Sequence, residues 1–325
     1  MKLRPLTSYI NSLLLVMLVF FVVLFNTTTA YSSSSILLIK PHKSIQLQKD
    51  CNINNGSACN LLGIIYQTGD GVAQSLSKAK LFYQKGCDLN DGQACLNLGN
   101  MYNDGNGVTK NLSTAFSLFQ KGCNLDYALA CSNLGTMYQT GQGADQDIST
   151  AAKLYHKGCD LDDGFSCAKL GALYVTGNSV NQNISSAVNL FQKGCDLNDG
   201  SACTLLGAMY YEGNGVSQNI SSAVNLFQKG CDLNDGSACN LLGNIYKNGK
   251  QKAVAQDLFK AKNLYQKGCN LNFGRACTNL GIMYEDGNGV GLNLSNAKSL
   301  YQKGCNLKDN TACILLETFS YACDS

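Results

Sequence analysis

Cysteines recur in this chain in pairs eight residues apart, and the pairs themselves recur on a regular period. Each pair begins 36 residues after the one before it, except for a single step of 38 residues from Cys231 to Cys269. A fixed period of this length is typical of repeat proteins, in which identical supersecondary units stack and each contacts only its neighbours. The eight pairs are Cys51/Cys59, Cys87/Cys95, Cys123/Cys131, Cys159/Cys167, Cys195/Cys203, Cys231/Cys239, Cys269/Cys277 and Cys305/Cys313.

The spacing within a pair predicts a disulfide across a chain reversal. In one continuous helix, residues eight apart lie about 12 Å apart along the axis, whereas a disulfide needs Cα atoms within about 7 Å. Cys87 and Cys95 therefore pair only if the chain reverses between them, and segment 88–92 (DLNDG) has the composition of a turn. We expect each pair to join the end of one helix to the start of the next, stabilising the fold by roughly 2–3 kcal/mol.

Zinc binding is the alternative use of these cysteines, and the sequence does not favour it. Zinc sites prefer cysteines separated by two to four residues and often include histidine. The chain has no C-x-x-C, and its histidines are His42 and His156. We predict neither a metal site nor a cofactor. Cys323 has no partner in the repeat pattern, so it is either a free thiol or a link between two chains in a dimer.

Each repeat is predicted to contain two helices. Helix A has Ala58, Leu62 and Tyr66 on one face and is ended by the glycines that follow. Helix B is expected to begin near Ser75 and to end at Gly86. Seven full repeats with half-repeats at both ends result, and such ends are typical caps of a solenoid. The full repeats are 56–91, 92–127, 128–163, 164–199, 200–235, 236–273 and 274–309.

A glycine recurs inside helix A of every full repeat. Because glycine in a helix costs about 1 kcal/mol against alanine, its recurrence predicts that helices A and B cross closely at that point. We expect the tyrosine three residues later, such as Tyr66, to fill the gap beside each crossing. The glycines are Gly63, Gly99, Gly135, Gly171, Gly207, Gly243 and Gly281.

These residues resemble a known repeat family. The segment 98–108 (LGNMYNDGNGV), followed by Ala115, is similar to the Sel1-like repeat, a relative of the tetratricopeptide repeat. The added cysteine pairs resemble the secreted Helicobacter cysteine-rich protein family. The resemblance covers residues 44–315 and implies an all-α fold, an α/α superhelical solenoid of Sel1-like repeats stapled by disulfides. It also implies protein binding along a concave face, and a penicillin-binding or weak β-lactamase activity.

The N-terminal segment predicts export. Lys2 and Arg4 precede an apolar run at 13–25, and small residues lead to a cleavage point after Ala30, which is the pattern of a secretory signal peptide. An uncleaved membrane anchor is the alternative, but the run is shorter than the roughly 20 residues that a bilayer span needs. We therefore expect no stable membrane span after cleavage.

The predicted domain organisation is a signal peptide at 1–30, a linker at 31–43 and a repeat solenoid at 44–325. The expected location is secreted or extracellular, in a periplasm or a secretory pathway, and the 17 cysteines suit such an oxidising compartment. Removing the signal peptide lowers the net charge from +3 to about +1, and Arg275 is then the one arginine left. Nucleic-acid binding requires a basic face, so we exclude it.

No catalytic constellation is visible in the sequence. A serine β-lactamase needs S-x-x-K together with S-D-N and K-T-G, and the last two do not occur. We expect His156, which replaces the usual glutamine of helix B, to be solvated, and we predict no catalytic residue. A β-lactamase or penicillin-binding hydrolase is the alternative function, on the resemblance alone. The S-x-x-K strings are Ser75/Lys78, Ser166/Lys169 and Ser295/Lys298.

Four Asn-x-Ser strings share the register just before helix B. Asparagine is among the preferred residues for capping a helix N-terminus, and capping is the role we favour. The same strings are N-glycosylation acceptors in a eukaryotic secretory pathway. Their asparagines are Asn111, Asn183, Asn219 and Asn293.

The predicted binding surface lies where the repeats differ from one another on helix A. We expect the varying registers, which begin at Asn60, Leu61 and Ile64 in the first repeat, to face outward. Asparagine amides carry both donors and acceptors, so a ladder of them suits an extended peptide or a glycan; a solvated, drifting surface is the alternative. We predict a secreted scaffold that binds a protein, peptide or glycan there. The candidate residues are Asn97, Asn100, Asn133, Lys169, Asn240, Asn244 and Asn279.

Overall fold

The computed structural model describes residues 44–249 and 254–323, with side chains as far as residue 319. The regular secondary structure of these residues is α-helical throughout. The predicted signal peptide and linker lie outside the described residues, as do part of the irregular loop of the sixth repeat, at 250–253, and the side chain of Cys323. Residues 44–52 are helical and precede the first full repeat.

Helix A of each full repeat spans 13 residues: α2 (Gly56–Thr68), α4 (Gly92–Asp104), α6 (Ala128–Thr140), α8 (Gly164–Thr176), α10 (Gly200–Glu212), α12 (Gly236–Asn248) and α14 (Gly274–Asp286). Helix B has the same length: α3 (Leu76–Asp88), α5 (Leu112–Asn124), α7 (Ile148–Asp160), α9 (Ile184–Asp196), α11 (Ile220–Asp232), α13 (Leu258–Asn270) and α15 (Leu294–Asn306). The last helix, α16 (Asn310–Cys323), takes the place of helix A in the C-terminal half-repeat.

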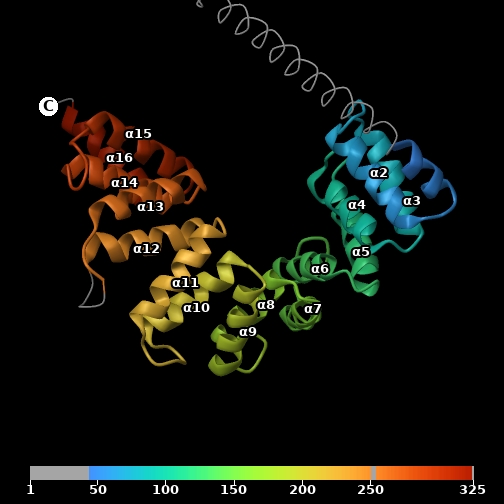
Figure 1. The fold of residues 1–325 in the computed structure, drawn as a ribbon, viewed down its shortest axis with the longest axis horizontal. Helices are drawn as coiled ribbons and strands as arrows, with labels where there is room; N and C mark the ends of the chain where they lie inside the picture. Colours follow the sequence, from blue (N-terminus) through green and yellow to red (C-terminus); the bar gives the residue numbers. More distant parts are fainter. Residues whose placement is uncertain (1–43, 250–253, 324–325) are drawn as a thin grey trace, which may run out of the picture. The chain divides into compact units, whose positions relative to one another are not determined.

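The described chain forms two compact bodies. The N-terminal body comprises residues 44–125, with α2 to α5, and the C-terminal body comprises residues 126–323, with α6 to α16. Within each body, every helix packs against the next one along the chain, and successive helix pairs stack (Figure 1). Each helix A also contacts the helix A of the next repeat in its body, as α10 does with α8 and α12.

The predicted helix boundaries are confirmed at the start of helix B and at the end of helix A. Ser75 caps α3 by accepting a hydrogen bond from the Lys78 backbone N–H, and Asn183 caps α9 in the same way. Helix α2 ends at Gly69, whose φ of 77° is left-handed. The capping role of the sequon asparagines therefore holds, since Asn111, Asn219 and Asn293 also accept from backbone N–H groups.

The glycine inside helix A is required by an aromatic ring on helix B. A Cβ atom at Gly135 would lie 2.9 Å from Tyr155 Cε1, and one at Gly171 would lie 2.6 Å from Phe191 Cε1. The predicted close crossing is confirmed. The helix A tyrosines, such as Tyr66 and Tyr284, pack against the core beside it, while the ring that meets the glycine comes from helix B. Those tyrosines are half-buried, whereas the helix B aromatics are at most 2% exposed. The helix B aromatics are Tyr83, Phe119, Tyr155, Phe191, Phe227, Tyr265 and Tyr301.

Helix B does not end at its glycine, as the sequence suggested, but continues for two more residues. Gly86 lies inside α3, where a Cβ atom would come within 2.8 Å of Ala94 Cβ in the following helix. This glycine therefore permits a close contact between repeats rather than a helix stop. The reversal follows at Asn90, whose φ of 63° is left-handed, and Asp91 then caps α4.

The predicted disulfides bridge this reversal. In seven of the pairs the two Cα atoms lie 4.5–4.8 Å apart, within the range that a disulfide allows. Cys123 and Cys131 are each disulfide-bonded as well. The seven pairs are Cys51–Cys59, Cys87–Cys95, Cys159–Cys167, Cys195–Cys203, Cys231–Cys239, Cys269–Cys277 and Cys305–Cys313.

Candidate functional site

One of the three helix A registers expected to face outward is buried. Asn60 is 2% exposed and Asn240 is 5% exposed. The reason is that this register faces the helix A of the next repeat, and that neighbour covers it. Asn97 Nδ2 donates to Asn60 Oδ1 at 2.8 Å, and Asn279 Nδ2 donates to Asn240 Oδ1 at 2.7 Å. Asn240 is therefore an interior link between α12 and α14, and the predicted outward position of its register is wrong.

The remaining candidate residues are half-buried and fall in both bodies. Asn97 and Asn100 belong to the N-terminal body, whereas Asn133 and Lys169 belong to the C-terminal body. The ammonium group of Lys169 lies 5.0 Å from the ring centre of Phe165, one turn earlier in α8. We call the half-buried and exposed helix A positions of each body its helix-A surface.

Asn244 uses only half of its side-chain amide within the fold. Its Oδ1 accepts from the Tyr265 hydroxyl at 2.7 Å and from Asn279 Nδ2 at 3.4 Å. Its Nδ2 has no acceptor among the described residues. Asn244 therefore presents two N–H donors to the outside.

A hollow of about 460 Å³ opens beside Asn244 on the helix-A surface of the C-terminal body. Helices α10 and α12 form its walls, and the buried ring of Phe227 contributes from α11. We call it the α10–α12 hollow. Its lining residues are Ala208, Tyr211, Glu212, Phe227, Leu241, Asn244, Ile245 and Asn248.

Sequence reasoning named Asn244 as a candidate and placed Ala208 and Leu241 in the outward registers, but it missed the other residues of this hollow. Two signals were present. Leu205 and Leu241 replace the polar residues that stand at this register in the neighbouring repeats, and Leu205 remains 37% exposed. Ala208 is also smaller than most residues at its register, which leaves space between the helices.

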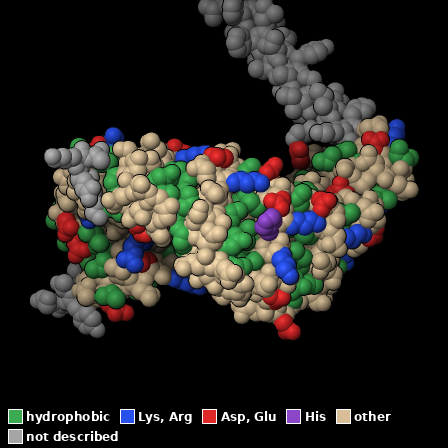
Figure 2. Space-filling view, turned by 90° about the horizontal axis from the view of Figure 1, so that it is seen from below, with side chains coloured by type: hydrophobic (Ala, Val, Ile, Leu, Met, Phe, Trp, Pro, Cys, Tyr) green, Lys and Arg blue, Asp and Glu red, His purple; other side chains and the backbone are tan. Residues whose placement is uncertain are grey.

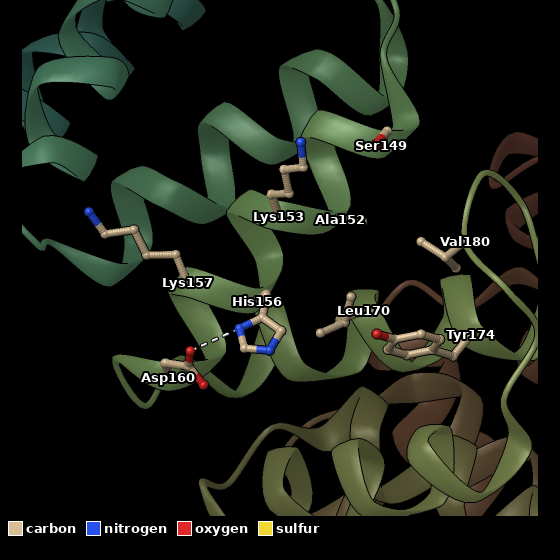
Figure 3. Close-up of a pocket in the computed structure, with 9 residues that line it drawn as sticks. All are labelled: Ser149, Ala152, Lys153, His156, Lys157, Asp160, Leu170, Tyr174 and Val180. Atoms are coloured by element: carbon tan, nitrogen blue, oxygen red, sulfur yellow. Dashed lines mark ion pairs between the residues drawn. The ribbon is translucent and has the colours of Figure 1, made fainter.

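A second hollow of about 460 Å³ lies between α7 and α8 (Figure 3). Its floor is apolar, with Ala152, Leu170 and Val180, and His156 and Tyr174 stand on either side of it. It exists because Ala152 replaces the valine that packs at this register in the next repeat, Val188.

His156, on the rim of that hollow, continues a contact that recurs along helix B. Its Nδ1 lies 2.8 Å from Asp160 Oδ2, and both side chains are largely exposed. In other repeats a glutamine makes the equivalent link, as Gln192 Nε2 does to Asp196 Oδ1 at 3.0 Å. His156 therefore replaces a surface glutamine in a structural pair.

Among the described residues, the S-x-x-K serines make no hydrogen bond to the side chains of their lysines. Ser75 is a helix cap. Ser166 is fully buried, where its hydroxyl lies 2.8 Å from Ser132 Oγ, and Ser295 is exposed. Within the described residues, no serine of these strings contacts a lysine ammonium group, and no cluster of three metal-ligating side chains is present.

The buried tyrosines act as neutral hydrogen-bond donors. Burial raises the pKa of Tyr83 to about 12, and it also raises the pKa of Tyr155 and of Tyr265. The Tyr155 hydroxyl donates to Gln139 Oε1 at 2.7 Å, as the Tyr265 hydroxyl does to Asn244. These phenols therefore tie helix B to the helix-A surface and supply no base at neutral pH.

Several charges are paired between successive repeats. Near the end of helix B, Lys157 Nζ lies 2.7 Å from Asp126 Oδ1, and Lys193 Nζ lies 3.2 Å from Asp162 Oδ1. On the face that Figure 2 shows, basic and acidic side chains are interspersed with apolar patches. On that face, no stripe of basic side chains of the kind that nucleic-acid binding needs is visible.

Among the described residues, no helix has both the length and the apolar character needed to cross a bilayer. The disulfides in successive repeats indicate an oxidising compartment.

Comparison with known proteins supports the repeat assignment. The Sel1 repeat profile matches residues 56–91, 92–127, 128–163, 164–199, 200–235, 236–273 and 274–309. These seven segments coincide with the repeats predicted from the cysteine period. Among curated proteins, none matches the chain significantly.

Solved structures with the same fold include two bacterial proteins. One is c5321, a protective antigen present in uropathogenic Escherichia coli strains, with 27% identity and a TM-score of 0.63. That match covers 85% of this chain and 59% of the antigen, so this chain spans little more than half of its length. The other is a Sel1 repeat protein from Oxalobacter formigenes, with 27% identity, a TM-score of 0.68, and coverage of 78% of this chain and 99% of that one.

The cysteine-rich protein B of Helicobacter pylori is also similar in sequence. It is 32% identical, with a TM-score of 0.35, and the match covers 42% of this chain and all but 1% of that protein. Seven matched repeats account for most of the 325 residues, with the cysteine pairs on the repeat period. The chain belongs to the Sel1 repeat family.

Proposed function

We propose that this protein is a secreted scaffold that binds another protein through its helix-A surface. The observation that carries the proposal is the α10–α12 hollow, in which an apolar floor lies beside polar groups that the fold leaves unused. Ligand sites in proteins combine these two features. Helical repeat proteins commonly bind partners along the surface that their stacked repeats create, so the family agrees with this function.

Secretion is supported by two independent features. The charged start, apolar run and small residues of segment 1–30 follow the pattern of a signal peptide. The disulfides of the repeats need an oxidising environment in which to form and persist. Both features favour a partner outside the cytosol.

The test is capture of a partner by the protein recovered from the extracellular medium. The mass of the recovered protein also shows whether the signal peptide is cleaved, so that the chain begins at Tyr31. We expect the wild type to capture a partner. A variant with alanine at four helix-A positions should capture at least tenfold less of that partner. The substitutions are Asn97→Ala, Asn100→Ala, Asn133→Ala and Lys169→Ala. Because Asn97 donates to the buried Asn60, this variant should lose about 1 kcal/mol of stability, so its fold is checked by circular dichroism.

The matched control changes four exposed residues that share one register on helix B. These are Ser117, Lys153, Asn189 and Asn225, each replaced by alanine. The control should bind the partner as the wild type does. If the helix-A variant binds normally, or if both variants lose binding equally, these four helix-A positions do not form the binding surface.

A further inference from the structure

The α10–α12 hollow contains a carboxylate that the fold does not neutralise. Glu212 is exposed on its rim, and it makes no hydrogen bond or ion pair with any residue that the structure describes. It is also the last residue of α10. The C-terminal end of a helix carries a partial negative charge, which disfavours a carboxylate and favours a cation. A positive group from outside would be stabilised at this position.

Neutral polar groups stand beside this carboxylate. Asn244 presents its two unused N–H donors, because its oxygen is occupied by Tyr265 and Asn279. Asn248, the last residue of α12, also lines the hollow and has no partner among the described residues. Donors of this kind suit backbone carbonyl oxygens, which an extended peptide offers at every residue.

The floor between these groups is apolar. Ala208 and Leu241 lie on the two walls, and the ring of Phe227 and the side chain of Ile245 lie below them. Leu205, one turn before Ala208 in α10, is 37% exposed and continues the apolar strip along the helix. About 460 Å³ is enough space for a large apolar side chain together with its flanking backbone.

We propose that the hollow binds an extended peptide segment of the partner, with an apolar side chain in the hollow and a neighbouring lysine or arginine on Glu212. The backbone carbonyl of that segment accepts from Asn244. This inference rests on the proposed function and adds the chemistry of the ligand to it. Charge complementarity selects a basic neighbour, since the uncompensated charge of the hollow is negative.

The experiment uses a library of random 12-residue peptides displayed on phage and selected on the full-length, oxidised wild-type protein. We expect the selected peptides to share an apolar residue next to a lysine or arginine. The consensus peptide is then made with a fluorescent label, in one form with the basic residue and in a second with glutamate in its place. Fluorescence anisotropy gives the Kd of each form.

Glu212→Lys should exchange the preference between the two peptides. We expect at least a tenfold loss of affinity for the basic peptide and at least a tenfold gain for the acidic one. Ala208→Phe, which fills the hollow, should weaken binding of both peptides at least tenfold. The matched control is Asp286→Lys, because Asp286 ends α14 at the register of Glu212 but does not line the hollow; it should change either Kd by less than twofold.

A gain of affinity for the acidic peptide cannot arise from misfolding, so the exchange tests the inference even if Ala208→Phe is unstable. Selected peptides without a basic residue, or equal binding of the basic peptide to Glu212→Lys and wild type, would overturn the inference. If such peptides still lose binding in the fourfold helix-A variant, the proposed function stands and this inference alone fails. If neither variant affects any selected peptide, both fail.

Discussion

Two faces of helix A differ in how much their residues vary between repeats. One face forms the seam with helix B of the same repeat, and the other forms the helix-A surface. At the seam, a glycine of helix A meets an aromatic ring of helix B in all seven full repeats. On the helix-A surface, the residue at the Asn244 register is isoleucine, asparagine, threonine or alanine in different repeats. Close packing constrains the seam, because a single added carbon would overlap the ring, whereas the surface has no such limit.

A third face shows that variation alone does not identify an exposed position. The register of Asn60 changes from repeat to repeat, yet every member is buried. The polar members of the register use different partners: Ser132 donates to Asp163, which caps the next helix A, and Thr278 donates to Asp309. The contact between repeats therefore accommodates both polar and apolar residues, while the seam holds glycine in every full repeat.

The largest expected effect on stability is the loss of one disulfide. Replacing Cys195 and Cys203 with alanine should lower the free energy of unfolding by about 2–3 kcal/mol, because the bridge closes a short loop between α9 and α10. Urea unfolding measures the loss, and hydrogen exchange should place it in these two helices. The control, Asn189→Ala on the exposed face of α9, should behave as the wild type. An unchanged unfolding curve for the double variant would show that the seams alone carry the stability.

The second effect tests the seam directly. Gly135→Leu should cost about 1–3 kcal/mol through overpacking against Tyr155, whose ring would lie 2.9 Å from the new Cβ. Thr136→Leu should cost about 0.5–1.5 kcal/mol, since Thr136 is half-buried and its hydroxyl lies 3.2 Å from the Tyr155 hydroxyl. Thr136 belongs to a register of the helix-A surface, but it is half-buried, so the change should cost more than it would at a fully exposed position.

Thermal unfolding of these two variants decides whether the seam is the more sensitive face. The control is Thr140→Leu, at the exposed end of the same helix, which should shift the stability by under about 0.5 kcal/mol. Equal melting temperatures for Gly135→Leu and Thr140→Leu would contradict the assignment of the seam.

The smallest expected effect concerns a carboxylate at the contact between repeats. Burial raises the pKa of Asp199 above 3.8, and the negative charges of Asp163 and Asp235 raise it further. The hydrogen bond from the Ala202 backbone N–H lowers this pKa but does not cancel the increase. Because the folded state binds this proton more tightly than the unfolded state, the stabilisation is complete below pH 3.8 and is lost as the pH rises through the raised pKa.

Asp199→Asn should therefore be slightly more stable than the wild type at neutral pH, and the advantage should disappear below pH 3.8. Asparagine caps a helix about as well as aspartate, so the cap of α10 is kept. The measurement is the difference in unfolding free energy between variant and wild type from pH 3 to 7. The control, Asp147→Asn, should show the opposite sign, because hydrogen bonds from Thr150 lower the pKa of that exposed carboxyl.

Most of the fold was predictable from the sequence, because its determinants lie within a few residues of one another. The cysteine spacing predicted the reversal between helices, and the structure places it at Asn90. The glycine of helix A predicted a close crossing, which Gly135 and Tyr155 confirm. The end of helix B was misplaced, because Gly86 serves a contact with the next repeat that the local sequence does not contain.

The candidate site was less predictable, because it depends on contacts between residues about 36 positions apart. By itself, the sequence determined the repeat, its two helices, the turn and the cysteine pairing, all of which follow from local periodicity and short loop closure. Only the tertiary structure decided that Asn240 is buried. It also decided that, among the described residues, Asn244 retains its N–H donors and Glu212 stands unpaired beside an apolar hollow. Those properties depend on which neighbouring side chain takes each hydrogen bond and covers each face, and this is settled only when one repeat packs on the next.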